Sequence, residues 1–179
     1  MPLHTARCRL HLQSHNQGVS LPVHQRSERS HIKTEVVLFS NSIIDPATIQ
    51  AYLETEYRVH GDAPFTLKIG TASHPLYEAH QRQNVACSAF ITAFNPYGQT
   101  FDETQNLQRN ATLRAELVKG GRALMEGIGQ HPSNDWPGEN SFLVFGVLLE
   151  DAKTLGTSFQ QNAIVWTGAD SVPQLVLLR

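Results

Sequence analysis

Two long apolar runs limit the folds that this chain can adopt. The first, "VACSAFITAF", covers Val85–Phe94, and the second, "SFLVFGVLL", covers Ser141–Leu149. A strand with one solvent-exposed face alternates apolar and polar residues, whereas these runs are almost continuously apolar, so we expect two strands buried on both faces. A sheet covered on both faces needs packed layers, which favours a sandwich of helices and sheet.

Helix and strand signals elsewhere complete this layered plan. Asp45 and Pro46 are a helix N-cap and first-turn pair, and the Thr100 and Glu103 spacing is that of a capping box. The further expected elements are a helix within 43–59, a strand at 65–70, a short helix at 75–84, a long helix from 100 to Gly120, a strand at 122–129, a helix at 150–161, and strands at 162–168 and 173–178. The sequence therefore predicts an α+β (or α/β) domain, with a mixed five- to six-stranded sheet, three to four helices and a C-terminal β-hairpin.

The first 33 residues differ from the rest of the chain. They contain five of the nine histidines and show neither helical nor strand periodicity, so we expect a disordered or spuriously translated tail. His11 and His15 have the spacing of a helical metal-binding pair, but no cysteine or acidic ligand accompanies them, and we expect no metal site. Residues 34–179 are expected to form a single globular domain.

Charge and cysteine content restrict the partners. Residues 1–33 carry five basic side chains against Glu28, a balance of +4, so the remainder of a chain with net charge −2 carries −6. An acidic domain makes nucleic acid an unfavourable partner, because binding it requires basic surface. Two cysteines, Cys8 and Cys87, cannot build a disulfide framework, and the eight-residue run Phe142–Leu149 is too short to span a bilayer. We expect a cytoplasmic, soluble protein without membrane contact.

Amides on the long helix suggest a site or a buried network. Asn106 and Asn110 share one helical face with Leu113 and Leu117, since the four residues are spaced by four, three and four. The leucines belong in the core, so both amides should point inward, where an amide without partners costs a few kcal/mol. Asn106 is therefore expected to belong to a hydrogen-bond network or to a ligand site.

Asn95 ends the first apolar strand, in "AFNPYG". Two roles fit it: a turn opener whose side chain bonds its own backbone, or a ligand contact close to the start of the long helix. Pro96 predicts an extended backbone at Asn95. If the side chain reaches the helix, three amides converge where the strand stops.

The loop Gly129–Asn140 leads into the second apolar strand and carries Glu139 close to the junction. A carboxylate there suits a general base or a partner for a sugar hydroxyl, and equally a surface acid or an anchor for the loop. Trp136 either lines a cleft or covers the sheet edge.

Gln161 and Asn162 end the last helix, where Asn is a common C-cap and Gln is less common. No phosphate-loop, dinucleotide-binding, Cys-x-x-Cys or zinc-protease motif is present, and the sequence names no cofactor.

These segments also resemble a known family. "FITAFNPYGQ", "QNLQRNATLRAEL", "DWPGENSFLVFGV" and "FQQNAIVW", in this order, are similar to the bacterial DUF3293 family over roughly Leu53 to Leu178. The resemblance implies a fold and a set of motif positions and does not imply a reaction. The family positions in this chain are Asn95, Asn106, Glu139, Ser141, Gln161 and Asn162.

Two functions follow as hypotheses. The first is an enzyme or binding domain for a small polar molecule, nucleotide-like or nucleotide-sugar-like, with Glu139 as the acid–base group. Its expected ligand contacts are Asn95, Asn106, Asn110, Ser141, Gln161 and Asn162. The second is a protein-interaction or regulatory module, in which the same amides form a structural network that holds the loop Gly129–Asn140. An open concavity lined by the polar set favours the first, and amides bonded only to backbone favour the second.

Overall fold

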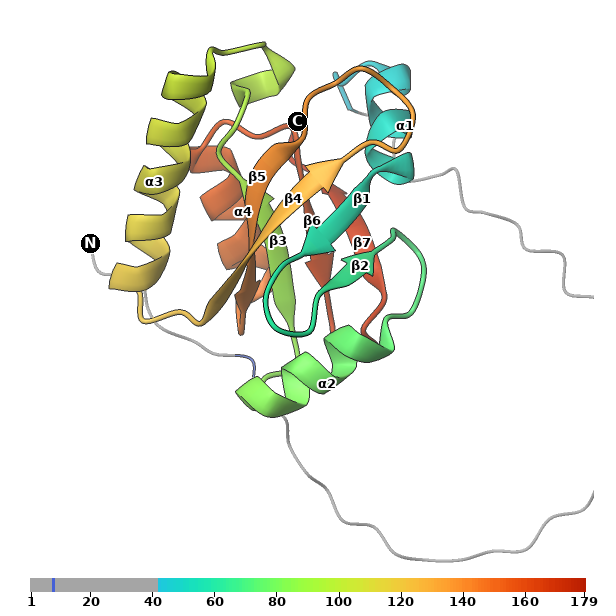
Figure 1. Ribbon diagram of the computed structural model, residues 1–179, viewed down its shortest axis with the longest axis vertical. Helices are drawn as coiled ribbons and strands as arrows, with labels where there is room; N and C mark the ends of the chain where they lie inside the picture. Colours follow the sequence, from blue (N-terminus) through green and yellow to red (C-terminus); the bar gives the residue numbers. More distant parts are fainter. Residues whose placement is uncertain (1–7, 9–41) are drawn as a thin grey trace, which may run out of the picture.

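A computed structural model describes Cys8 and residues 42–179 (Figure 1). Four α-helices, one 3-10 turn and seven strands make up the described part of the chain. In order they are α1 (Pro46–Glu54), β1 (Glu56–Val59), β2 (Phe65–Leu67), α2 (His74–Gln83), β3 (Ser88–Thr92), the turn Pro96–Gly98, α3 (Glu103–Lys119), β4 (Leu124–Gln130), β5 (Glu139–Phe145), α4 (Leu149–Ser158), β6 (Ala163–Thr167) and β7 (Pro173–Leu177).

The seven strands form one sheet in the order β2-β1-β4-β5-β3-β6-β7, and every neighbouring pair is antiparallel. The predicted layers of helices and sheet, and the C-terminal hairpin of β6 and β7, are confirmed. The predicted mixed sheet of five to six strands is wrong in both strand number and direction. Antiparallel neighbours do not need a helical crossover between them, so the helices here are free to lie at the ends of the strands as well as on the faces of the sheet.

The unpredicted strand is β1, which begins two residues after α1 ends. Thr55 ends the helix by directing both its backbone N–H and its hydroxyl to the carbonyl of Ala51, at 3.0 and 2.8 Å. The chain then turns directly into a hairpin with β2 and pairs with β4. Hydrophobic periodicity does not predict this change from helix to strand, because four residues are too few to establish a period of two.

Both faces of the sheet are covered, as the apolar runs predict. One face packs under α3 and α4, where Ile91 and Val144 meet Leu113 and Leu117. The other face packs in part under α2, through Leu76 and Ala79. Residues of β3 and β5 alternate between these two clusters, which confirms that both strands are buried on both sides.

The helices α1 and α2 lie at opposite ends of the strands (Figure 1). Asp45 caps α1, as predicted, and accepts a hydrogen bond from the N–H of Ala47 at 2.7 Å. The N-cap of α3 is Asp102, which accepts from Gln105 at 2.9 Å, so the predicted capping box from Thr100 is wrong. A carboxylate two residues nearer the helix takes the place of the threonine.

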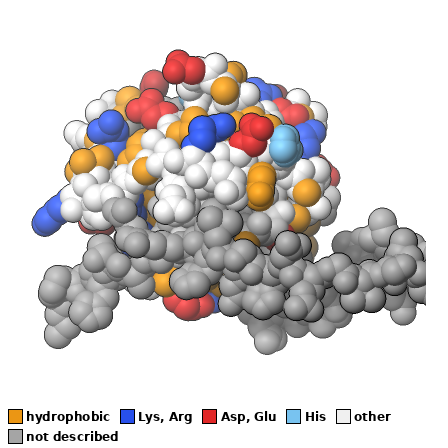
Figure 2. Space-filling view, turned by 90° about the horizontal axis from the view of Figure 1, so that it is seen from below, with side chains coloured by type: hydrophobic (Ala, Val, Ile, Leu, Met, Phe, Trp, Pro, Cys, Tyr) orange, Lys and Arg blue, Asp and Glu red, His pale blue; other side chains and the backbone are white. Residues whose placement is uncertain are grey.

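Within residues 1–33 the structure describes Cys8, whose carbonyl accepts from the N–H of Ala86 at 3.2 Å. The predictions for a tail and for His11 and His15 otherwise lie outside the described residues. No helix in residues 42–179 has both the length and the apolar character needed to cross a bilayer. Figure 2 shows acidic and basic side chains interspersed on the uncovered part of the face that it displays.

His80 should make the stability of the fold depend on pH. It is 2% exposed, bonds the hydroxyl of Ser88 at 2.9 Å and meets Phe145 edge-on, and burial lowers its pKa to about 4. In the unfolded chain His80 takes up a proton near pH 6.5. The contribution of neutral His80 to the free energy of unfolding is therefore fully present above pH 6.5 and is lost as pH falls to about 4. We expect the free energy of unfolding to lose roughly 3 kcal/mol through this group.

Urea unfolding of the wild type and His80→Gln between pH 4 and 7.5 tests this expectation. The difference between the two curves removes the contribution of the carboxylates that titrate in both proteins. Parallel curves over this range would show that His80 is not held neutral by the fold.

Candidate functional site

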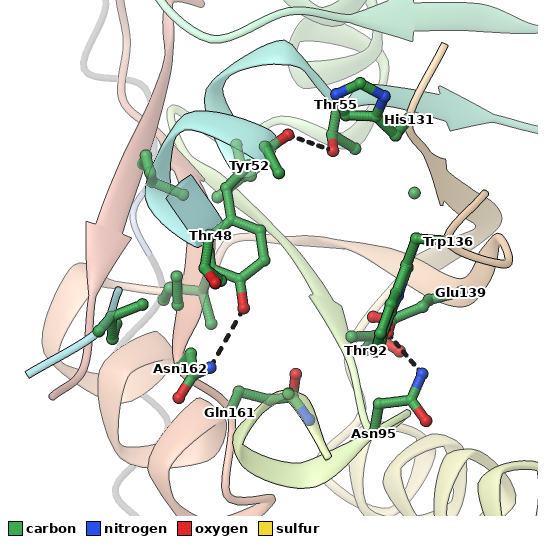
Figure 3. Close-up of a pocket in the computed structure, with 18 of the residues that line it drawn as sticks. Thr48, Tyr52, Thr55, Thr92, Asn95, His131, Trp136, Glu139, Gln161 and Asn162 are labelled. Atoms are coloured by element: carbon green, nitrogen blue, oxygen red, sulfur yellow. Dashed lines mark hydrogen bonds between the residues drawn. The ribbon is translucent and has the colours of Figure 1, made fainter. Parts of the chain in front are cut away.

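A pocket of about 550 Å³ opens between α1 and the sheet (Figure 3). It lies on the face of the sheet that α2 covers in part, beyond the area under that helix. Its size lies within the usual range for small-molecule sites, about 300–1,000 Å³. Polar and aromatic side chains from α1, from the strands β1, β3 and β5, and from the segments between elements line it: Thr48, Tyr52, Thr55, Tyr57, Phe90, Thr92, Asn95, Tyr97, His131, Trp136, Glu139, Ser141, Gln161, Asn162 and Arg179.

Small residues on neighbouring strands make this hollow possible. Gly129, Ser141, Thr92 and Ala163 supply the sheet positions that face the pocket from β4, β5, β3 and β6. A Cβ atom added at Gly129 would meet only Thr55 and Tyr57, at ordinary contact distances of 3.8 to 4.0 Å. A Cβ atom at Gly127 would instead lie 2.8 Å from the ring of Phe90. The ring of Phe90 therefore marks where the packed core ends and the pocket begins.

Glu139 opens β5 and lies in the pocket wall. Its Oε1 accepts hydrogen bonds from the side-chain amide of Asn95 at 2.7 Å and from the indole N–H of Trp136 at 3.1 Å (Figure 3). Burial raises the pKa of this carboxyl, and the two hydrogen bonds oppose the rise without cancelling it. Both bonds fall on one oxygen, which leaves Oε2 with acceptor capacity.

No ion pair to Glu139 occurs within the described residues. From the sequence, either burial or hydrogen bonding could dominate the pKa of Glu139. In the structure the effect of burial is the larger, so the pKa is raised. The donors are also not the neighbours in sequence, since the hydroxyl of Ser141 bonds the Glu139 carbonyl instead, at 2.9 Å. A partly buried acid without a cation partner among the described residues is costly to the fold, which is typical of a functional group.

Asn95 connects the pocket wall to α3. Its N–H donates to the Oδ1 of Asn106 at 2.8 Å, and its own Oδ1 accepts from the amide of Asn106 at 3.0 Å and from the N–H of Phe101 at 3.1 Å. The backbone of Asn95 is left-handed, with φ 46° and ψ 62°, so the extended conformation expected before Pro96 is wrong. The hydrogen bonds to Asn106 and Phe101 hold this unfavourable conformation in place.

A second left-handed residue, Tyr97, follows at φ 55°. Its N–H donates to the carbonyl of Gln160, itself left-handed at φ 59°, over 2.7 Å. Non-glycine residues in this region cost of order 1–3 kcal/mol each and cluster at functional sites. Two of these three strained residues, Asn95 and Tyr97, line the pocket.

Asn106 and Asn110 point inward from α3 together with Leu113 and Leu117, as the spacing predicts. Asn106 bonds Asn95 and the carbonyl of Phe101, and the Oδ1 of Asn110 accepts from the N–H of Ala93 at 3.3 Å. Neither residue lines the pocket. They lie behind its wall and hold the chain that leaves β3, whereas Asn95, Glu139, Ser141, Gln161 and Asn162 reach the wall itself.

Gln161 and Asn162 enter from the connection between α4 and β6. The amide of Gln161 donates to the carbonyls of Phe94 and Phe159, at 2.9 and 3.3 Å, so it mainly fixes backbone. Asn162 donates to the hydroxyl of Tyr52 at 3.2 Å, across the pocket from Glu139 (Figure 3). It does not cap α4, which ends at Ser158 with Phe159 as its C-cap residue.

The sequence did not single out Tyr52 or Arg179 as site residues. Tyr52 shares a helical face with Ile49, which suggests core packing, yet its ring lies along the pocket (Figure 3). Burial raises the pKa of Tyr52, the hydrogen bond with Asn162 opposes the rise, and the charge of Glu139 adds to it. Arg179 reaches the pocket through the pairing of β7 with β6, which no local pattern reveals.

Trp136 is held over Glu139 by the loop between β4 and β5. His131 Nδ1 accepts from the N–H groups of Ser133 and Asn134, and its Nε2 lies 3.2 Å from Glu54 on α1. The N–H of Trp136 then donates to Asn134 at 3.1 Å. Trp136 therefore lines the pocket while remaining 40% exposed.

A family model described as "Protein of unknown function (DUF3293)" matches residues 91–164. No curated protein and no solved structure matches the chain significantly. The matched segment runs from β3 into β6 and holds Asn95, Asn106, Glu139, Gln161 and Asn162. The chain is thus similar to the DUF3293 family over the segment that supplies most of the polar wall of the pocket.

Proposed function

We propose that this chain binds a small polar molecule in the pocket between α1 and the sheet. The observation that carries the proposal is Glu139, a desolvated carboxylate in the pocket wall with no cation partner among the described residues. Its supports, Asn95 and Trp136, are themselves held by a strained turn and by an ordered loop. A fold that maintains such an arrangement at a cost in stability is expected to use it.

The lining favours a molecule with rings and hydroxyl groups, such as a nucleotide or a nucleotide-sugar. Trp136, 40% exposed, offers an aromatic face for stacking, and Tyr97, equally exposed, holds the guanidinium of Arg179 against its ring. Ser141 and Asn162 offer hydroxyl and amide groups, which bind sugar hydroxyls and base edges without adding charge.

Glu139 is the proposed acid–base group of any reaction in this pocket. The other acid in the lining, Asp45, is engaged in capping α1. A carboxyl whose pKa lies above its usual range is better suited to proton transfer near neutral pH than an ordinary glutamate.

The alternative is a protein-interaction module, and one observation favours it. Ile43 is 73% exposed and lines the same pocket as the exposed Tyr97 and Trp136, so the mouth has an apolar rim. A peptide side chain could enter there, while Asn106 and Asn110 serve only the fold.

Filling the pocket from Gly129 tests the proposal. Gly129→Leu should add a side chain into the pocket, where the first added carbon makes only ordinary contacts, so the fold should be retained while ligand binding is lost. A thermal-shift screen of nucleosides, nucleotides and nucleotide-sugars should find a compound that stabilises the wild type by about 2–4 kcal/mol at saturating concentration. The same compound should leave Gly129→Leu unshifted.

Two variants control this experiment. Gly129→Ala should bind nearly as well as the wild type, because one Cβ atom makes only ordinary contacts there. Gly127→Ala should instead unfold more easily, by about 1–3 kcal/mol, since its Cβ would meet the carbonyl of Arg58 at 2.5 Å. Equal binding by the wild type and Gly129→Leu would place the ligand elsewhere.

A further inference from the structure

We infer that the ligand carries an oxyanion, a phosphate or a carboxylate. Arg179 binds this group beside Asn162, on the side of the pocket opposite Glu139. The inference rests on the proposed function and adds the class of ligand and a binding residue. It starts from two charged side chains of opposite sign, Arg179 and Glu139, which line one cavity and form no ion pair with any residue that the structure describes.

The first observation is the state of the Arg179 side chain. Its guanidinium carbon lies 4.1 Å from the centre of the Tyr97 ring, and its Nη1 makes a long contact of 3.4 Å with the Oδ1 of Asn162. No ion pair to Arg179 occurs within residues 42–179. Stacking on Tyr97 orients the guanidinium but leaves most of its five N–H donors available, and such a planar fork matches an oxyanion.

The second observation is the set of donors beside it. The hydroxyl of Tyr52 accepts from Asn162, so its own proton is available to a ligand. The amide of Asn162 has a second hydrogen beyond the one that it gives to Tyr52. Gly98 packs against Asn162, since a Cβ atom added at Gly98 would come within 3.2 Å of the side-chain amide nitrogen of Asn162. Three donor groups, from α1, from the segment after β7 and from the residue before β6, thus meet at one place.

The third observation is the layout of charge. In Figure 3, Tyr52 and Asn162 lie on one side of the pocket and Glu139 with Trp136 on the other. A ligand that presents an oxyanion to Arg179 and a hydroxyl or amine to Glu139 would complete both ends together. A neutral ligand would leave the guanidinium unused, and a ligand with an anion at the Glu139 end would be repelled.

Matched pairs of compounds test this inference by isothermal titration calorimetry. The pairs are a nucleoside with its 5′-monophosphate, a sugar with its 1-phosphate, and a sugar with its uronate. In the wild type, at least one charged member should bind about ten- to a hundredfold tighter than its neutral partner, the range expected of charge-assisted hydrogen bonds. The uronate pair distinguishes a carboxylate ligand from a phosphate ligand.

Arg179→Gln should remove this advantage while leaving the affinity for the neutral member nearly unchanged, and Arg179→Lys should restore part of it. Arg122→Gln is the matched control, because Arg122 pairs with Asp151 and does not line the pocket. The inference is overturned if the advantage persists in Arg179→Gln, or if charged and neutral members bind equally.

The two proposals fail in different ways. If neutral members bind the wild type and are excluded by Gly129→Leu, while the charged members gain nothing, the pocket is a ligand site and only the role of Arg179 is refuted. If no member of any pair binds the wild type, both proposals are contradicted.

Discussion

Replacing Asn106 with leucine is expected to lower the free energy of unfolding by about 2–4 kcal/mol, although it adds apolar volume to a buried position. The change strands two groups, the N–H of Asn95 and the carbonyl of Phe101, and it removes one of the two donors to the Oδ1 of Asn95. Burying such groups without partners costs about 1–3 kcal/mol each, partly relieved by relaxation. Asn95 would also be free to leave its left-handed conformation, so affinity at the pocket should fall as well.

Gln108→Leu is the matched control, since Gln108 lies on the same helix with its side chain exposed. Its effect should stay within about 0.5 kcal/mol. Urea unfolding of the three proteins gives the comparison. Equal and negligible effects at both positions would refute the account of Asn106 as the support of the pocket wall.

Replacing Glu139 with glutamine should separate function from folding. Glutamine keeps an oxygen that can accept from Asn95 and Trp136, and removes a charge that burial disfavours. The fold should therefore be retained or become more stable at neutral pH. If the pocket turns its ligand over, the rate should fall by roughly 10²–10⁴-fold, because a positioned acid–base group contributes about this much.

The pH dependence of this variant has a definite sign. The native pKa of Glu139 lies above its ordinary value, so the stability that it contributes is present below pH 4.5 and is lost as pH rises through the native pKa. Glu139→Gln lacks this loss, and its advantage over the wild type should grow as pH rises. Urea unfolding between pH 4 and 8 measures it, with the exposed Glu126→Gln as control. A variant less stable than the wild type at pH 8 would indicate that Glu139 anchors the loop.

Local patterns predicted what depends on near neighbours. The spacing of Asn106, Asn110, Leu113 and Leu117 predicted a buried face of α3, because helical periodicity is set within a few turns. Asp45 predicted the start of α1 for the same reason. The strand β1 was missed, because its conformation comes from pairing with β2 and β4 rather than from its own four residues.

The candidate site was only partly predictable. The amides and Glu139 lie at junctions of elements, where polar residues beside apolar strands are conspicuous in the sequence. Their hydrogen-bond partners are set by how distant parts of the chain pair and pack. Glu139 bonds Asn95, which is 44 residues away, and Asn162 bonds Tyr52, which is 110 residues away. The left-handed backbone at Asn95 also opposes the local preference set by Pro96, since bonds from α3 override it.

The two tryptophan indole N–H signals give the most direct test of the pocket. Trp136 donates its indole proton to Glu139, whereas Trp166 donates to the carbonyl of Val147 at 3.0 Å and does not line the pocket. In a ¹H–¹⁵N NMR titration with the compound found by the thermal-shift screen, the Trp136 signal should move and the Trp166 signal should stay. An unmoved Trp136 signal at saturation, or a shift confined to Trp166, would contradict the assignment of this pocket as the ligand site.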